Sequence, residues 1–237
     1  MKALITYKKT EWVNEIAKQL EEEFDDFHYI FAKNGDMEVV NREEEFVKSS
    51  YDKIIRFGTY ANYLPNSRVE YNPYKGIKTT SFKLKARKIF EDNFVPIPKT
   101  FSRHELFDKI KKGEEIPNKL IGRTKKHHGG QDLKVYEGID EIKHELEWEN
   151  NSYYFSEVYP KSKEYRVHIA SGKALIVAEK VVEEDKQDKI VWNLGNEGVC
   201  EDFDTLRWSE YSDVEEIIKV ASLATYSVGL DYGAVDI

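Results

Sequence analysis

The side chains best suited to chemistry lie in one short run, Lys163-Glu164-Tyr165-Arg166-Val167-His168-Ile169. If this run is a strand, alternation places its apolar residues on one face and its charged or titratable residues on the other, namely Glu164, Arg166 and His168. A half-buried antiparallel strand with a solvated polar face has the same pattern. The neighbourhood favours a site, because Glu157-Val158-Tyr159 lies just upstream and Lys180 lies on the expected partner strand.

A second candidate is the loop His127-His128-Gly129-Gly130-Gln131-Asp132, which follows Arg123 and Lys125. Two glycines between strands let backbone N–H groups approach an anion closely, and the nearby cations add positive charge. An ordinary hairpin loop has the same composition. The loop matches neither the Walker nor the dinucleotide-binding pattern. Adjacent histidines are poorly spaced to bind one ion, so the sequence predicts no zinc site.

The third candidate is Asp236, in the run Tyr232-Gly233-Ala234-Val235-Asp236-Ile237. Alternation places Asp236 on the face opposite Val235 and Ile237. A carboxylate in an otherwise apolar strand is unfavourable unless it is exposed, paired or bound to a metal. Solvation near a terminus is the alternative explanation.

Composition limits the classes of function. The 237 residues are 34% charged and carry a net charge of −8, so a protein that relies on attraction to nucleic-acid backbones is not indicated. The longest apolar run, Ala174–Ala178, is far too short to span a bilayer. Cys200 is the only cysteine, which excludes an internal disulfide and fits a cytoplasmic setting. The oligomeric state is left open.

Local patterns predict the elements that position these residues. Strands are expected at 3–7, 28–32, 53–57, 120–124, 133–136, 153–159, 165–170, 173–182 and 232–237. Helices are expected after Thr10, at 82–92, at 140–148 and after Ser212, where Ser212-Asp213-Val214-Glu215 reads as a capping box. The first β–α–β stretch predicts a small parallel sheet over about 70 residues, and 71–74 reads as a domain joint. Ser171-Gly172 predicts a tight hairpin.

Taken in order, these segments resemble the ATP-grasp ligases, especially the branch that contains the ribosomal-protein glutamate ligases. They are also similar to the amidoligase-like ATP-grasp proteins of phages. The resemblance covers about Tyr71–Ile237. It implies a mixed α/β and α+β fold: a small N-terminal parallel α/β domain over 1–75, then an ATP-grasp fold with an N-terminal subdomain over 76–152 and an incomplete C-terminal subdomain over 153–237.

The resemblance also implies which residues approach the phosphates of ATP. In the family a lysine that opens the entry helix does so, and Lys83 matches it better than Lys85. Arg123 stands where the family usually presents a phosphate-binding lysine, a change that keeps the charge and adds a planar fork. The loop at 127–132, with Lys125, Gly129 and Gly130, corresponds to the flap that closes over the phosphates.

The adenosine side follows from the segment Tyr154–Tyr159, which resembles the hinge strand of the family. Its backbone at Val158 and Tyr159 would hydrogen-bond the adenine edge, and Glu157 would accept from the adenine amino group. Glu164 would face the ribose.

The remaining matches concern the reaction. Arg166 would face the acyl phosphate or the acceptor substrate, Lys180 and Asn193 match a cation and an asparagine near the transferred phosphate, and Asp236 matches the first magnesium carboxylate. With ATP and Mg²⁺ as cofactors, a small-molecule or peptide carboxylate would be phosphorylated and then attacked by an amine, giving an amide.

One part of the family pattern is missing. Family members continue into another strand that carries a glutamate and an asparagine for two magnesium ions, whereas this chain ends at Ile237. Either the natural polypeptide is longer, or the sequence has been cut, or another chain completes the sheet. Of these alternatives we expect truncation of a longer protein. Two other functions remain open: a nucleotide-binding or scaffold protein that has lost catalysis, and a sugar- or nucleotide-modifying enzyme on an unrelated fold.

Overall fold

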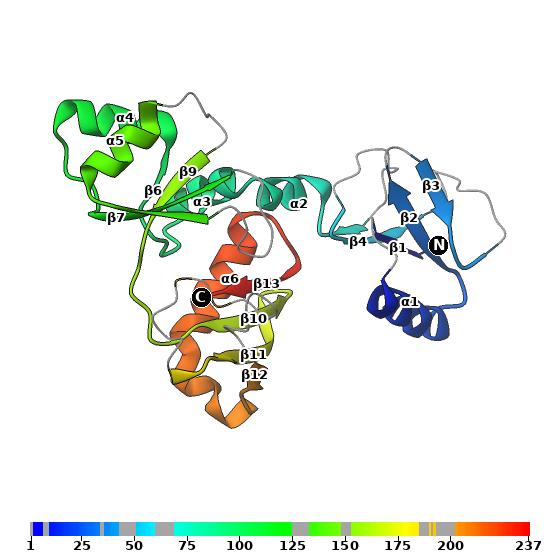
Figure 1. Ribbon diagram of the computed structural model, residues 1–237. Coiled ribbons are helices and arrows are strands. Elements are labelled where there is room, and N and C mark those ends of the chain that lie inside the picture. The colour runs from blue at the N-terminus through cyan, green and yellow to red at the C-terminus, as the bar shows by residue number, and fades with distance from the viewer. Residues whose placement is uncertain are drawn as a thin grey trace. The chain divides into compact units, whose positions relative to one another are not determined.

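The computed structural model describes residues 2–6, 10–33, 36–42, 51–59, 69–124, 133–147, 153–184, 190, 192 and 202–237 (Figure 1). The chain forms two compact units. The first contains residues 1–80 together with 229–232, and the second contains 81–228 together with 233–237.

The first unit is built on a five-stranded sheet of order β3-β2-β1-β4-β5. Its strands are β1 (Lys2–Thr6), β2 (Phe27–Lys33), β3 (Asp36–Val39), β4 (Lys53–Phe57) and β5 (Val69–Tyr71). All neighbours pair in parallel except β2 and β3. The predicted parallel sheet is therefore confirmed, while the short strands β3 and β5 were not predicted.

Helix α1 (Glu11–Glu23) covers one face of this sheet. Val13 and Ala17 of α1 pack against a cluster formed by Leu4, Phe27 and Tyr29, as the amphipathic spacing predicts. Thr10 does precede the helix, but its side chain makes no capping hydrogen bond. The start of the helix was therefore predicted correctly, but the predicted cap by the Thr10 side chain was not found.

Asn72 ties the second segment of this unit to the first. Its amide oxygen accepts from the backbone N–H groups of Asp231 and Tyr232 at 2.8 and 3.0 Å, and its amide nitrogen donates to the Tyr232 carbonyl at 2.9 Å. Its own N–H donates to the Asp231 carboxylate at 2.6 Å. Asn72 has φ of 55°, a left-handed conformation that asparagine tolerates better than most residues.

Helix α2 (Tyr74–Ser81) follows, a short helix that was not predicted, and leads into α3 (Lys83–Asp92) of the second unit. This unit contains two four-stranded sheets. The first has the order β6-β9-β7-β8, formed by β6 (Thr100–Ser102), β9 (Tyr153–Glu157), β7 (Lys119–Thr124) and β8 (Leu133–Glu137). Helices α4 (Arg103–Lys112) and α5 (Ile139–Glu147) share a core with it.

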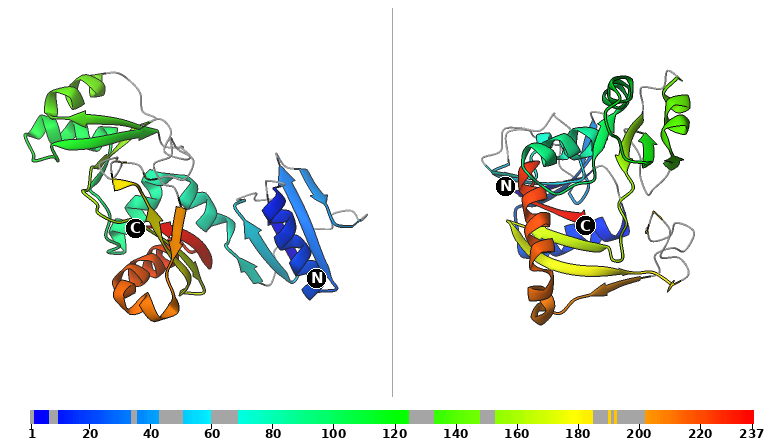
Figure 2. Two further views of the ribbon diagram at one scale, coloured as in Figure 1. Left: turned by 60° about the horizontal axis from the view of Figure 1, so that its bottom comes forward. Right: turned by 90° about the vertical axis from the view of Figure 1, so that its left-hand side faces the viewer.

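The second sheet has the order β12-β11-β10-β13. It contains β10 (Tyr165–Ala170), β11 (Lys173–Val181), β12 (Asp202–Thr205) and β13 (Tyr232–Asp236). One face of β10 and β11 packs against α6 (Glu215–Ser227) (Figure 2). Tyr165, Val167 and Ile169 point into that core, so the predicted alternation of β10 is confirmed.

The predicted capping box at Ser212 is wrong. The 3-10 helix η3 (Trp208–Val214) occupies this stretch, α6 begins only at Glu215, and its N-cap residue, Val214, makes no side-chain bond. The helix itself, its apolar stripe and its end are confirmed, because Ala221, Ala224 and Val228 are buried and Gly229 has φ of 72°.

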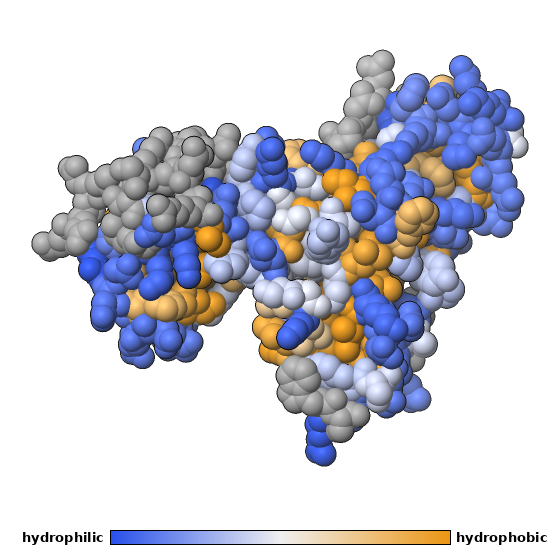
Figure 3. All heavy atoms as spheres, turned by 180° about the vertical axis from the view of Figure 1, so that it is seen from behind, coloured by the Kyte–Doolittle hydropathy of each residue, from blue (hydrophilic) through white to orange (hydrophobic). Residues whose placement is uncertain are grey.

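The surface is polar over much of the face seen in Figure 3, with smaller hydrophobic areas between the charged side chains. Within the described ranges, every helix is too short or too polar to cross a bilayer.

Candidate functional site

The open face of the sheet β12-β11-β10-β13, opposite α6, carries the charged side chains that the sequence singled out. Tyr165 and Ile237 exchange both backbone hydrogen bonds, at 2.7 and 2.9 Å, so β10 and β13 are antiparallel neighbours. This register places Arg166 beside Asp236. The guanidinium donates to both carboxylate oxygens, Nε to Oδ1 at 2.8 Å and Nη2 to Oδ2 at 3.0 Å.

Lys180 joins these two residues from the neighbouring strand β11. Its side chain is 1% exposed, its ammonium nitrogen lies 3.7 Å from Asp236 Oδ1, and it donates to Glu164. Burying an ammonium group is unfavourable unless it is paired, and here two carboxylates compensate it. Glu164 also accepts from Lys161, so it is held between two cations.

Asp236 is thereby held in its charged form. Desolvation raises the pKa of this carboxyl, but the hydrogen bond from Arg166 and the charge of Lys180 outweigh that effect and keep the pKa below its ordinary value. The free-energy cost of a carboxylate in an otherwise apolar strand is therefore offset by its pairing with Arg166 and Lys180.

A second group of cations comes from α3 and β7. Lys83 and Arg87 are one turn apart on α3, and electrostatic interactions link Lys83 to Arg87, to Arg123 on β7 and to Asp236. Loss of hydration lowers the pKa of Lys83, and Arg87 and Arg123 lower it further while Asp236 opposes them. Arg87 also donates to Thr100 Oγ1 at 3.0 Å.

The two groups together form what we call the cation cluster: Lys83, Arg87, Arg123, Lys161, Arg166 and Lys180, with the carboxylates Glu164 and Asp236. Positive charge is in clear excess here, although the whole chain carries −8. The Nε of Arg123 is buried and has no hydrogen-bond partner among the residues that the structure describes. A buried charged donor without an acceptor is costly, so this arrangement fits an anionic ligand such as a triphosphate.

The predicted hinge segment, Tyr154–Tyr159, covers most of β9 and the two residues after it. The N–H of Glu157 donates to the Lys99 carbonyl at 2.9 Å and that of Val158 to the Lys119 carbonyl at 3.2 Å. These two amides are therefore engaged within the protein. Tyr159, which is 69% exposed, is the hinge residue most open to a ligand.

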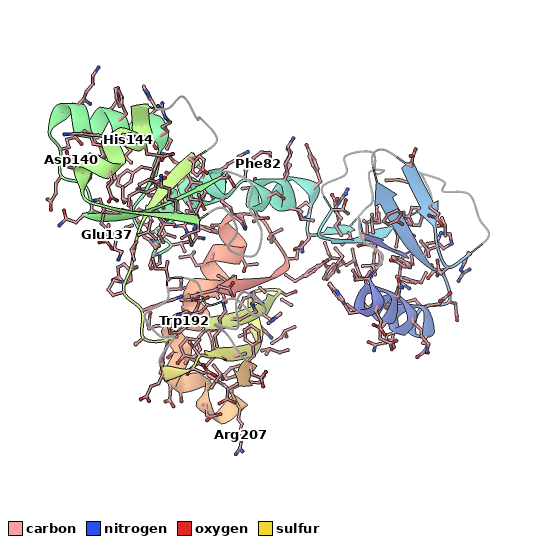
Figure 4. The ribbon with its side chains drawn as sticks, viewed as in Figure 1. Phe82, Glu137, Asp140, His144, Trp192 and Arg207 are labelled. Atoms are coloured by element: carbon pink, nitrogen blue, oxygen red, sulfur yellow. The ribbon has the colours of Figure 1, made fainter. Side chains whose placement is uncertain are left out.

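Trp192 lies next to Lys161 of the cation cluster. It is 2% exposed, and its buried indole Nε1 finds no hydrogen-bond partner within the described part of the chain. The Lys161 ammonium lies 4.4 Å from its ring centroid. Figure 4 shows Trp192 beside the sheet that carries β10, whereas Glu137, Asp140 and His144 lie with β8 and α5.

The structure thus brings together Lys83, Arg123, Glu164, Arg166, Lys180 and Asp236 of the residues predicted from sequence. Lys85 lies two positions from Lys83 on α3, which turns it to another side of the helix. The predicted residues Lys125, Gly129, Gly130 and Asn193 lie outside the described residues.

Sequence reasoning missed Arg87 and Lys161. Arg87 could have been found from its i, i+4 spacing to Lys83 on the predicted helix. Lys161 had a weaker signal, because its contacts with Glu164 and Trp192 depend on how the segment after β9 folds back.

Magnesium is held in proteins by several oxygen ligands close together. Among the described residues there is no group of three or more histidine, cysteine, aspartate or glutamate side chains suited to a metal ion. Asp236 is one carboxylate, already bound by Arg166 and near Lys180. The described residues therefore do not form a metal site on their own.

No protein-family model matches the sequence, and no curated protein matches it either. Solved structures do. The ATP-grasp ligase PsnB in complex with a minimal precursor matches with a TM-score of 0.64 at 13% identity, over 100% of this chain and 85% of that one. The same ligase with minimal precursor, Mg and ADP matches with a TM-score of 0.61 at 13% identity, over 100% and 83%.

Two further structures agree. The D-alanine–D-alanine ligase of Bacillus anthracis with ATP matches with a TM-score of 0.56 at 14% identity, over 100% of this chain and 81% of that one. A RimK domain ATP-grasp protein of Sphaerobacter thermophilus matches with a TM-score of 0.58 at 8% identity, over 99% and 84%. At such low identity the likeness establishes the fold.

Proposed function

We propose, from the ATP-grasp fold that the chain shares with these ligases, that it is an ATP-dependent ligase that joins a carboxylate to an amine through an acyl phosphate. The observation that carries the proposal is the cation cluster. Its members come from α3, β7, β10, β11 and the segment after β9. Arg166, Lys180 and Lys83 interact with Asp236, Lys161 and Lys180 interact with Glu164, and Arg87 and Arg123 interact with Lys83.

The charges suit the first half of such a reaction. ATP and a carboxylate repel each other, so positive side chains are needed to bring the γ-phosphate and the carboxylate oxygen together. Lys83 and Arg123 would bind phosphate oxygens, and Arg123 would use its unpartnered Nε to do so. Arg166 and Lys180 would stabilise the charge that builds up as the phosphoryl group is transferred.

The adenosine end would lie toward the hinge. Tyr159 would supply backbone groups to the adenine, Glu157 would accept from its amino group, and Glu164 would accept from the ribose. Magnesium would arrive with the nucleotide, whose phosphates are its usual ligands, and Asp236 would add one protein oxygen. Lys125, Gly129, Gly130 and Asn193 retain the flap and phosphate roles proposed from sequence.

A first experiment measures binding. Isothermal titration calorimetry with the non-hydrolysable analogue AMP-PNP and Mg²⁺ should show binding to the wild-type chain. Arg123→Gln should weaken it roughly 10- to 100-fold, because hydrogen bonds between charged groups contribute about 1.5–3 kcal/mol each. Lys163→Met is the matched control, since Lys163 pairs with Glu179, which alternation on β11 places on the face opposite Lys180. No binding by the wild type would refute the proposal.

A second experiment measures turnover. ADP release should require both a carboxylate and an amine, supplied as a mixture of the standard amino acids and short peptides. Arg166→Ala should abolish this release while the circular dichroism spectrum stays unchanged, because Arg166 lies on the open face and leaves the core intact. Full turnover by Arg166→Ala would show that the reacting groups do not meet on this face.

One observation favours a second candidate, a nucleotide-binding protein without catalysis. The described residues near the cation cluster offer few carboxylates, and both are already committed to cations. Tight AMP-PNP binding with no ADP release across the substrate mixture would support this alternative over the ligase.

A further inference from the structure

His168 lies on the open face of β10, two residues beyond Arg166 of the cation cluster. We call His168 and the residues directly opposite it on the two neighbouring strands its row. The register pairs His168 with Ile176 on β11 and, counting from the Tyr165–Ile237 pair, with Ala234 on β13. Arg166 stands two residues earlier on the same face, about 7 Å away along the strand. His168 is exposed, and its row neighbours are apolar residues that cannot pair with an imidazole.

The local backbone changes at this row. The register between β10 and β11 shifts between His168 and Ile169, and β11 contributes Leu175 as an additional residue between Ala174 and Ile176. Leu175 and Ile176 are 53% and 44% exposed. A bulge of this kind bends a strand and redirects its side chains, and such bulges are common beside active sites.

His168 also differs chemically from the acids on this face. Glu164 is held by Lys161 and Lys180, and Asp236 is held by Arg166 with Lys180 close by. The oxygen atoms of both carboxylates are therefore already engaged with cations. His168 makes no hydrogen bond or ion pair within the part of the chain that the structure describes, so a neutral imidazole there can accept a proton.

The order of groups along β10 indicates which substrate His168 would meet. If the proposed function holds, the adenosine lies toward Glu164 and the γ-phosphate lies near Arg166 and Asp236. The next position along the strand is then where the attacking group must approach. Because the carboxylate needs cations, and the row of His168 has none, this position suits the amine.

We propose that His168 contacts the amine substrate and accepts its proton as the amide bond forms. The amine nitrogen attacks the acyl carbon, a C–N bond forms, and the C–O bond to phosphate breaks. The phosphate leaves with the electron pair of that bond. The nitrogen releases one proton, which passes to the imidazole of His168. The apolar neighbours Ile176 and Ala234 shape the site for an amine with a nonpolar portion beside the reacting nitrogen.

The placement of His168 can be tested without knowing the substrates. Its imidazole Cε1–H resonance can be assigned by its disappearance in His168→Gln, and AMP-PNP with Mg²⁺ should shift it. The resonance of His144 on α5 serves as the control and should stay in place (Figure 4). AMP-PNP binding with an unmoved His168 resonance overturns this inference alone. If calorimetry detects no AMP-PNP binding, the proposed function fails and this inference fails with it.

The chemical role has its own test. With the standard amino acids as substrates, His168→Gln should lower kcat for ADP release about 10²-fold, in the range of general base catalysis, while KM for ATP stays unchanged. Hydroxylamine is largely unprotonated at neutral pH and needs less help from a base, so product formation with hydroxylamine should be nearly normal in His168→Gln. An equal loss with both nucleophiles, or no loss with either, would refute proton transfer to His168.

Discussion

Lys83 is the residue of the cation cluster whose protonation we expect to respond to an anionic ligand. Its pKa is lowered by loss of hydration and by the charges of Arg87 and Arg123. A bound triphosphate would favour the charged ammonium. Nucleotide binding should therefore raise the pKa of Lys83 and take up a proton from solution at pH values near its lowered pKa.

Because nucleotide binding should raise the pKa of Lys83, the affinity for nucleotide should depend on pH. The affinity for AMP-PNP should be constant while Lys83 is protonated in the free protein and should fall as the pH rises through its lowered pKa. Calorimetry in buffers of different ionisation enthalpy would detect the proton uptake. In Lys83→Met the affinity should be weaker and this uptake should disappear. Undiminished proton uptake in that variant would assign the effect to another group.

The sequence predicted those residues of the cation cluster whose side-chain direction depends only on the alternation of faces along a strand. Arg166 and Asp236 are examples, since each sits on the polar face of a strand whose other face is apolar. Their direct hydrogen bonds could not be predicted, because they depend on which strands become neighbours. Lys161 was missed for the same reason: local sequence does not reveal that it reaches Glu164 and Trp192.

At the scale of elements, Gly122 shows how closely the first sheet of the second unit is packed. A Cβ atom at this position would lie 2.7 Å from Tyr136 Cε2 and 3.3 Å from Phe155 Cε1. Both rings are 1% exposed, so neither can move aside easily. The next residue on β7 is Arg123, and the glycine therefore allows β7 to lie flat against these rings while it presents Arg123.

We predict that Gly122→Ala lowers the free energy of unfolding by about 1–3 kcal/mol, as measured by urea denaturation, because the added methyl group overpacks the core. The matched test is the double variant with Tyr136→Leu, which removes the ring atoms that clash. The alanine should then cost clearly less than it does alone. Strictly additive losses would show that the Tyr136 ring is not the obstacle.

Elements with strong periodicity were the most predictable from sequence. The strands that became β1, β4, β7, β10 and β13 were located within a residue or so at each end. Helix α4 was not predicted, although Ser102 and Glu105 form a true capping box at its start. The box assigned to Ser212 failed because η3 continues past it, and a local motif cannot show that tertiary packing will favour a 3-10 helix there.

At the scale of the whole molecule, the Asn72 contacts connect distant parts of the sequence. The side chain binds backbone groups of Asp231 and Tyr232, which are 159 and 160 residues away. We predict that Asn72→Gly lowers the free energy of unfolding of the first unit by about 1–3 kcal/mol, because buried backbone groups lose their partners. Hydrogen exchange at the Tyr232 amide should accelerate.

Asn72→Ala separates the two contributions of this residue. Alanine loses the same hydrogen bonds and must also adopt the left-handed conformation, so it should cost about 1 kcal/mol more than glycine. If both variants match the wild type in urea denaturation and in amide exchange, these hydrogen bonds do not stabilise the unit.

Strand β13 has a consequence for how the protein can be divided. Its first residue, Tyr232, belongs to the first unit, and the residues after it, including Asp236, belong to the second. A shortened protein that begins at Ser81 would retain every cation named above, but it would lose Asn72, whose hydrogen bonds hold Tyr232 at the start of the strand that carries Asp236. A substitution that weakens the first unit should therefore also affect Asp236, which follows Tyr232 by only four peptide bonds.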